Sequence, residues 1–462
     1  MSNNSEQTKN VPNEEKLPFI RKFGYTWSGI AYLFCMLLPA YIMYFCTQNL
    51  ALAVGSVSIM IMLVKILDGV VDLFAGILID KTKSPQGKAR PWFLRMAFPY
   101  ALCLALIFYV PASLSSTAKL ILVAVLYALT VSVFGTILGV ARYSLIPRMT
   151  SDQKERYTLG ILGDGVPFLL MGVLMALTMP IVKAIGWRMT FTIYAIVAFI
   201  ASLLCYALTR EKNFEINTGF AEESDRKRTE IKDFFKTLFT NKYALFLLIY
   251  ALVVEIAGGL LQVGPLYYFQ FVLKNMDLYT LVMLGTVVSG LIGMVLAGFI
   301  TKKTGKIFGI GCIGAVVCFV ALLINNGASN IVTLIFVDLA AMFGITFTIT
   351  AFGPMAANTI EYGEYKTGVR AEGVTSAVVN IGIKIGTALA SALLGGIMAA
   401  GGFVSGSDTQ SASAVNSIRM GYLVAPLVIF AVIGIFFFLT YNLDKKYPEI
   451  VAELNKRKGI EK

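Results

Sequence analysis

The chain has 462 residues, of which 57% are hydrophobic and only 14% charged, with 39 basic and 27 acidic side chains. Soluble domains carry about 25% charged residues, whereas a transmembrane helix needs roughly 20 predominantly apolar residues. The composition therefore excludes a soluble protein and predicts a polytopic membrane protein. The chain contains no histidine, which excludes imidazole catalysis and histidine-ligated metals. Because no nucleophile–base or metal-binding pattern appears either, we expect no enzyme activity and no cofactor.

Twelve apolar stretches follow one another along the chain. They cover residues 25–47, 53–79, 93–112, 120–141, 157–185, 191–208, 243–273, 279–300, 307–323, 330–357, 374–400 and 422–441. The longest polar interruption separates six stretches from six. We therefore expect five parts: a cytoplasmic N-terminal tail (1–24), an N-terminal six-helix bundle (25–208), a cytoplasmic connector (209–242), a C-terminal six-helix bundle (243–441) and a cytoplasmic C-terminal tail (442–462).

Basic residues are distributed unequally between the ends of these helices. With both termini inside, only five of the 39 Lys and Arg side chains lie outside, namely Lys119, Lys183, Arg188, Lys274 and Arg419. Such an excess on one side marks the cytoplasmic side of a membrane protein. We therefore expect a multi-pass protein of the inner (plasma) membrane with both termini in the cytoplasm. The net charge of +12 reflects this topology and contact with anionic lipid, so it requires no nucleic-acid partner.

The two halves of the sequence also resemble each other. The loop at residues 76–89 is echoed at 298–307, and the loop at 146–157 has a weaker counterpart at 360–373. A duplicated six-helix unit joined by a cytoplasmic connector is the signature of the major facilitator fold, whose halves move about a mid-membrane site. We therefore predict an all-α polytopic protein with twelve transmembrane helices in two pseudo-symmetric six-helix bundles.

The second apolar stretch carries three charges, Lys65, Asp68 and Asp72. Helical spacing places all three on one face, and each charge at the centre of a membrane helix costs roughly 2.5–3.5 kcal/mol on insertion scales. Two convergent carboxylates with a nearby hydroxyl suit a small cation such as Na⁺, or a shared proton. The alternative is a purely structural ion network in which Lys65 and Lys384 neutralise the two aspartates.

Other polar residues in the apolar stretches are candidates for binding substrate. Arg142 and Tyr143 directly follow the fourth stretch, at the inner end of the fourth helix, and either face the cavity or belong to the loop. Asp164 and Glu255 are candidates for contacts with substrate hydroxyls or for carrying a proton. Tyr32 is either a packing residue or a ring that stacks on a sugar, and Asp338 reads as a helix-end charge.

Several ordered motifs then point to a known family. Residue 65 begins KILDGVVDLFAGILIDKTKSPQGKARPW, followed by YSLIP at 143–147, EYGEYKTGVRAEG at 361–373 and IKIGTA at 383–388. Together they resemble the glycoside–pentoside–hexuronide cation symporters, the melibiose permease family, over about residues 20–445.

This resemblance implies roles for individual residues. Asp68 and Asp72 match the two cation-site acids of the family, and Thr136 matches its hydroxyl ligand, so these three would ligate the cation if it is Na⁺. Lys384 matches a lysine beside both binding sites. Asn380 sits at a neighbouring position that the resemblance places near the cation or the sugar, and Lys65 and Asn380 join Lys384 as candidate coupling residues.

Departures from the family pattern concern the sugar site. The first helix reads TWSGIAYLF, with no acid where sugar-transporting members usually carry one, and Gly139 stands at the position of a second sugar-binding Asp. Tyr143 replaces a tryptophan, and Asp164 aligns approximately with an arginine. We therefore do not expect an unmodified galactoside to be the best substrate.

The resulting functional hypothesis is cation-coupled symport, with Na⁺ or H⁺, of a sugar or glycoside by alternating access. Arg142 and the missing acids favour an acidic sugar such as a glucuronide. One alternative is a cation-coupled carrier of an amphipathic or lipid-like solute, and another is a membrane sensor that does not transport. The expected partners are the small-molecule substrate and membrane lipid, and we expect a monomer.

Overall fold

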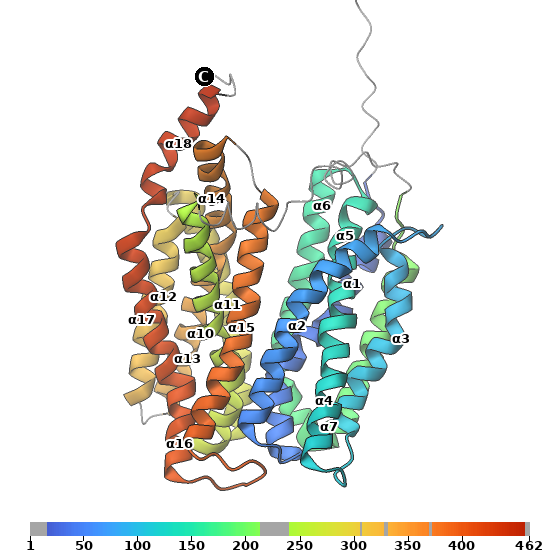
Figure 1. Cartoon of the computed structure of the whole chain (residues 1–462), viewed down its shortest axis with the longest axis vertical. Helices are drawn as coiled ribbons and strands as arrows, with labels where there is room; N and C mark the ends of the chain where they lie inside the picture. The colour runs from blue at the N-terminus through green and yellow to red at the C-terminus, as the bar shows by residue number, and fades with distance from the viewer. Residues whose placement is uncertain (1–15, 213–239, 305–306, 328–330, 369–371, 458–462) are drawn as a thin grey trace, which may run out of the picture.

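The computed structural model describes residues 16–212, 240–304, 307–327, 331–368 and 372–457. These residues form helices and contain no strand. Figure 1 shows two bundles side by side, α1 to α7 in one and α10 to α18 in the other. We call the end that holds α6, α14 and α18 the upper end, and the end that holds α16 the lower end, as in Figure 1.

The N-terminal half contains eleven helical segments, four of which are short 3₁₀ or π segments within or after longer helices. The segments are α1 (Phe19–Tyr44), η1 (Phe45–Asn49), α2 (Val54–Asp80), α3 (Arg90–Leu106), η2 (Ile107–Tyr109), α4 (Ser116–Ala128), η3 (Leu129–Gly135), α5 (Thr136–Met149), α6 (Gln153–Gly160), η4 (Ile161–Gly165) and α7 (Val166–Leu208). Gly186 divides α7 because its backbone adopts a φ of 79°, which L-residues with side chains rarely adopt.

The C-terminal half has the same character. Its segments are α10 (Lys242–Tyr267), η5 (Tyr268–Val272), α11 (Met276–Thr304), α12 (Ile307–Gly327), α13 (Ile331–Thr350), α14 (Phe352–Thr367), α15 (Glu372–Ala400), α16 (Ala412–Arg419), η6 (Met420–Val424), α17 (Ala425–Thr440) and α18 (Leu443–Arg457).

The helices account for the predicted twelve membrane spans. Nine segments of the described chain are long and apolar enough to cross a membrane, and the break at Gly186 makes two spans of one of them. The shorter apolar helix α12 and the helix α2, whose apolar run is interrupted by its three charges, complete the set. The predicted fold of two six-helix bundles is confirmed.

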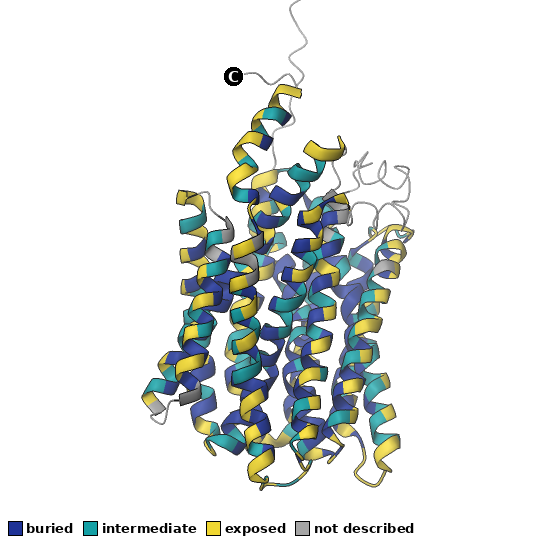
Figure 2. Ribbon diagram, turned by 60° about the vertical axis from the view of Figure 1, so that its left-hand side comes forward, coloured by how far each residue is buried: buried dark blue, intermediate teal, exposed yellow. Residues whose placement is uncertain are grey.

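The outer surface of both bundles is apolar. Large exposed side chains such as Phe299, Phe336, Val295 and Leu439 project from it, and Figure 2 shows the buried residues gathered on the inner faces of the helices. An exposed apolar surface of this size fits hydrocarbon rather than water.

The two halves touch unequally along their length. Near the lower end, Thr47 Oγ1 and Tyr267 OH lie 2.8 Å apart, Tyr44 OH donates to Gln270 Oε1, and Tyr279 OH donates to Met175 O at 3.4 Å. Between described residues, every other hydrogen bond or ion pair that joins the halves lies at the lower end or at mid-height. The described halves are therefore joined below and not at the upper end.

Candidate cation and substrate site

Lys384 occupies the centre of the contact between the two halves. It comes from the middle of α15, which packs against α2. Its Nζ lies 3.2 Å from Asp68 Oδ2, pairs with Asp72 Oδ2, and donates to the backbone oxygen of Asp68 at 3.1 Å. The two aspartates are one helical turn apart on α2, so a single ammonium reaches both carboxylates.

Thr136 completes this group from α5. Its hydroxyl donates to Asp68 Oδ1 at 2.6 Å, and its side chain is buried. The π-helical segment η3 comes directly before it, and Ser132 Oγ of that segment donates to Val64 O of α2 at 2.9 Å. Single-turn π segments of this kind are frequent at functional sites. The structure thus brings Asp68, Asp72, Thr136 and Lys384 together, and we call these four residues the mid-height site.

The charges of the mid-height site do not balance. One ammonium faces two carboxylates, and Lys65 makes no ion pair with any described residue. The sequence offered the alternative that Lys65 and Lys384 neutralise the two aspartates. In the structure Lys384 pairs with them, and Lys65 does not. One negative charge remains in a region where unpaired charge is costly.

Arg142 lies in the helix α5 rather than in the loop, and its guanidinium is buried. It pairs with Asp164 Oδ1 of η4 and donates to Gly163 O at 2.6 Å. The hydroxyl of Tyr143 donates to the same Asp164 oxygen at 3.2 Å, while 54% of the surface of Tyr143 is exposed. The charge of Arg142 is thus balanced inside the N-terminal half.

Two further candidates lie apart from these ion pairs. The ring of Tyr32 covers Gly139, because a Cβ at that glycine would lie 3.0 Å from Tyr32 Cε2. Tyr32 therefore fills space beside the position at which the resemblance places a sugar-binding acid. Asn380 is exposed, and it forms no hydrogen bond with a described residue.

A cavity of about 260 Å³ lies mainly in the C-terminal half, and its lining includes Thr387, one turn of α15 after Lys384. Polar groups line it at Glu255, Gln262, Thr286, Asp338 and Thr387, and most of its other walls are apolar. No Lys or Arg is among its lining residues. The sequence predicted a role for Glu255, whereas Asp338 was read as a helix-end charge. That reading is wrong, because Asp338 lies two turns inside α13 and is 6% exposed.

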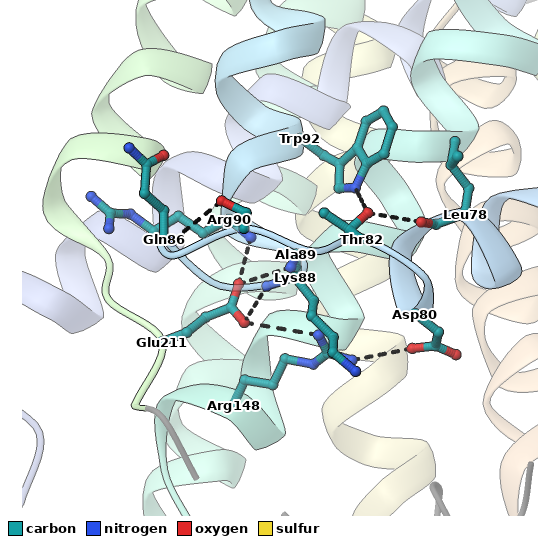
Figure 3. A network of polar contacts seen from close by, with 11 residues as sticks. Leu78, Asp80, Thr82, Gln86, Lys88, Ala89, Arg90, Trp92, Arg148 and Glu211 are labelled. Atoms are coloured by element: carbon teal, nitrogen blue, oxygen red, sulfur yellow. Dashed lines mark hydrogen bonds and ion pairs between the residues drawn. The ribbon is translucent and has the colours of Figure 1, made fainter. Parts of the chain in front are cut away.

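A second polar network lies at the upper end and ties the loop before α3 to the end of α7 (Figure 3). Glu211 accepts hydrogen bonds from the three backbone N–H groups of residues 88–90, at 2.9, 2.8 and 2.6 Å. Arg148 lies 3.8 Å from Glu211 and 3.2 Å from Asp80. A carboxylate at this place satisfies the free N–H groups at the start of α3. All of these residues belong to the N-terminal half.

Two six-helix halves that meet around a charged mid-height site define a transporter of the major facilitator class. The chain belongs to the family described as MFS/sugar transport protein, which it matches over residues 24–445. This membership confirms the resemblance drawn from the sequence motifs.

Known relatives cover almost the whole chain. It is 27% identical to the isoprimeverose transporter of Lactiplantibacillus pentosus, over 98% of this chain and 95% of the relative. It is 26% identical to the glucuronide carrier protein homolog of Escherichia coli (strain K12), over 95% of this chain and 96% of the relative. Among solved structures, a bacterial homolog of the human lysosomal transporter Spinster shares the fold, with a TM-score of 0.71, 12% identity and coverage of 94% of this chain and 99% of that chain.

Proposed function

We propose that this protein imports a sugar or glycoside together with a cation by alternating access between its two halves. The observation that carries the proposal is the contact of Lys384 with both Asp68 and Asp72 across the halves. A cation binding in place of the ammonium would break the only mid-height ion pairs that join the described halves. Occupancy of the site would then change the contact between the halves, which is what coupling requires.

The proposed cation ligands are the carboxylates of Asp68 and Asp72 and the hydroxyl of Thr136. These are hard oxygen donors, and two carboxylates supply the negative charge that Na⁺ or H⁺ would neutralise. Lys384 acts as an internal competitor for the same oxygens. We keep Lys65 and Asn380 as candidate coupling residues: Lys65 forms no ion pair, and Asn380 no hydrogen bond, with a described residue, so both side chains are free to change partners.

We propose that the protein lies in the inner membrane of the cell. In the proposed orientation, both termini and the upper end face the cytoplasm. No hydrogen bond or ion pair between described residues joins the halves at the upper end, so in this orientation we infer a conformation that is open toward the cytoplasm. Binding from outside would require the hydrogen bonds of Thr47 with Tyr267 and of Tyr44 with Gln270 to break.

The proposed substrate site is the cavity of about 260 Å³ that Glu255 and Thr387 line. Its carboxyl, amide and hydroxyl groups, such as Glu255 and Gln262, suit sugar hydroxyls, because a buried polar group left unpaired by the wrong ligand is penalised. The absence of basic residues from its walls favours a neutral glycoside. An acidic sugar such as a glucuronide would require Arg142 to leave Asp164.

A lipid-like solute is the second candidate for this cavity. Four methionines line it (Met171, Met175, Met283 and Met342), and methionine walls adapt to flexible apolar ligands. The relatives with sugar names support the first candidate, whereas this apolar lining supports the second.

The test uses the purified full chain. A thermal-shift screen with isoprimeverose, raffinose, a glucuronide and a lysophospholipid, each with and without Na⁺, identifies the ligand class. Uptake and counterflow of the positive compound are then measured in proteoliposomes with and without Na⁺ or H⁺ gradients. Uptake that is indifferent to every ion gradient would overturn symport, and binding without counterflow would identify a sensor.

A further inference from the structure

Asp338 is a buried carboxyl group that the proposed cation site does not use. It lies in α13, within an apolar run, and is 6% exposed. No basic side chain of the described chain lies within 4.0 Å of it. A carboxylate in such a place would carry its full desolvation cost without a compensating charge.

The hydrogen bonds around Asp338 are one-sided. Asn325 Nδ2 of α12 donates to Asp338 Oδ1 at 2.8 Å, and Tyr422 OH of η6 donates to the same oxygen at 3.2 Å. No described residue donates to the second carboxyl oxygen. Asn325 Oδ1, meanwhile, is buried and has no hydrogen-bond partner. The described contacts therefore leave two acceptor oxygens, Asp338 Oδ2 and Asn325 Oδ1, without a donor.

The described neighbouring elements supply no positive charge that would balance a carboxylate at Asp338. The titratable and charged groups facing this region are Glu255 on α10, Tyr268 on η5, Tyr279 on α11, Tyr422 on η6 and Arg419 on α16. Arg419 interacts with Tyr268 and forms no ion pair with Asp338. Glu255 lines the same cavity, so a second carboxylate there would add repulsion.

We propose that Asp338, Asn325 and Tyr422 form a proton-binding site that is separate from the mid-height site. At neutral pH the second oxygen of Asp338 carries a proton that it has bound from the bulk aqueous phase, and the resulting O–H donates to Asn325 Oδ1. The carboxylic acid of Asp338 and the amide of Asn325 then form two hydrogen bonds with each other, while Tyr422 donates to the carbonyl oxygen of the acid. Release of the proton returns a carboxylate to the cavity wall, so this group sets the charge that a ligand meets there.

The inference concerns the folded chain and stands without the proposed symport. Only its bearing on coupling, as a place for H⁺ apart from Asp68 and Asp72, rests on the proposed function.

Infrared difference spectroscopy of the purified protein tests the inference, because the carbonyl stretch of a protonated carboxylic acid is resolved from that of a carboxylate. At neutral pH the wild type should show an acid band that Asp338→Asn loses, since the introduced amide is of the same shape and can still pair with Asn325. Glu255→Gln is the matched control from the same cavity, and the band of Asp338 should persist in it.

Tyr422→Phe provides a second variant should Asp338→Asn fail to fold. It removes one donor from the acid's carbonyl oxygen, so the band should stay and move to higher frequency. The proposal is overturned if the wild type has no acid band at neutral pH, if the band is unchanged in Asp338→Asn, or if Tyr422→Phe does not shift it. If the acid band behaves as expected but no ion gradient drives uptake, the proposed symport is contradicted and the proton-binding site at Asp338 stands.

Discussion

The ammonium of Lys384 lies 3.2 Å from the carboxylate of Asp68, although 316 residues separate them in sequence and they belong to different halves. The same ammonium also pairs with Asp72. One side chain of the C-terminal half therefore contacts both acidic groups of α2, and in the proposed mechanism a bound cation would compete with it for these carboxylates.

Replacing Lys384 by glutamine should make the protein depend on an added cation. Two carboxylates would face each other without an ammonium, and we expect a loss of about 1–2 kcal/mol of stability. This is below the roughly 3–5 kcal/mol of a fully buried pair, because Asp72 is 40% exposed. The measurement is the melting temperature with and without Na⁺, or at lower pH if the cation is a proton.

Lys65→Gln is the matched control for that experiment, since Lys65 lies on the same helix and forms no ion pair with a described residue. The cation should raise the melting temperature of Lys384→Gln more than that of the wild type or of Lys65→Gln. An equal rise in all three proteins would contradict the competition between Lys384 and the cation.

Thr136→Val should weaken cation binding without removing the contact between the halves. The substitution keeps the shape of the side chain and deletes a hydroxyl that donates to a carboxylate, and bonds to charged groups contribute about 1.5–3 kcal/mol. We expect the Na⁺ concentration at half-maximal uptake to rise about tenfold or more. Ser132→Ala, which deletes a hydroxyl bonded only to a backbone oxygen, should leave this concentration close to that of the wild type.

Arg142 and Asp164 should be energetically coupled. Asp164→Asn leaves a buried guanidinium without its counter-charge, whereas Arg142→Gln leaves a carboxylate that is half exposed. The first variant should therefore lose more stability, and the double variant should lose less than the sum of the two, by about 0.5–3 kcal/mol. Additive losses in denaturation of the purified protein would show that the pair is not coupled.

Tyr267→Phe should shift the equilibrium between the two conformations of the transporter. It removes the bond to Thr47 that helps to join the halves at the lower end, at about 1 kcal/mol, which corresponds to roughly a fivefold change in population. Distances between spin labels placed on the lower ends of α1 and α10 should then show more of the open form. An unchanged distribution would mean that this bond does not control closure.

The sequence predicted the spans because apolar runs need no tertiary information, and the one-turn spacing of Asp68 and Asp72 already placed them on one face. The sequence also predicted that Lys384, which belongs to the second half, is the partner of these two aspartates. It did not predict that Arg142 is paired with Asp164, because approach of η4 to α5 depends on packing. Asp338 was missed for a different reason: its partners Asn325 and Tyr422 come from two other elements, and only its apolar flanks signalled burial.

The closure at the lower end rests mainly on neutral partners: hydroxyl with hydroxyl, and hydroxyl with amide. Among the described residues, the one ion pair that joins the halves there is Lys183 with Asp277; it spans 3.9 Å, and both side chains are largely exposed. Dissolved salt screens exposed charges and leaves uncharged hydrogen bonds nearly untouched. Ionic strength should therefore have little influence on how often the lower end opens. In the proposed orientation this end faces the outside of the cell, so the proposed response to a particular cation would be separate from the salinity around it.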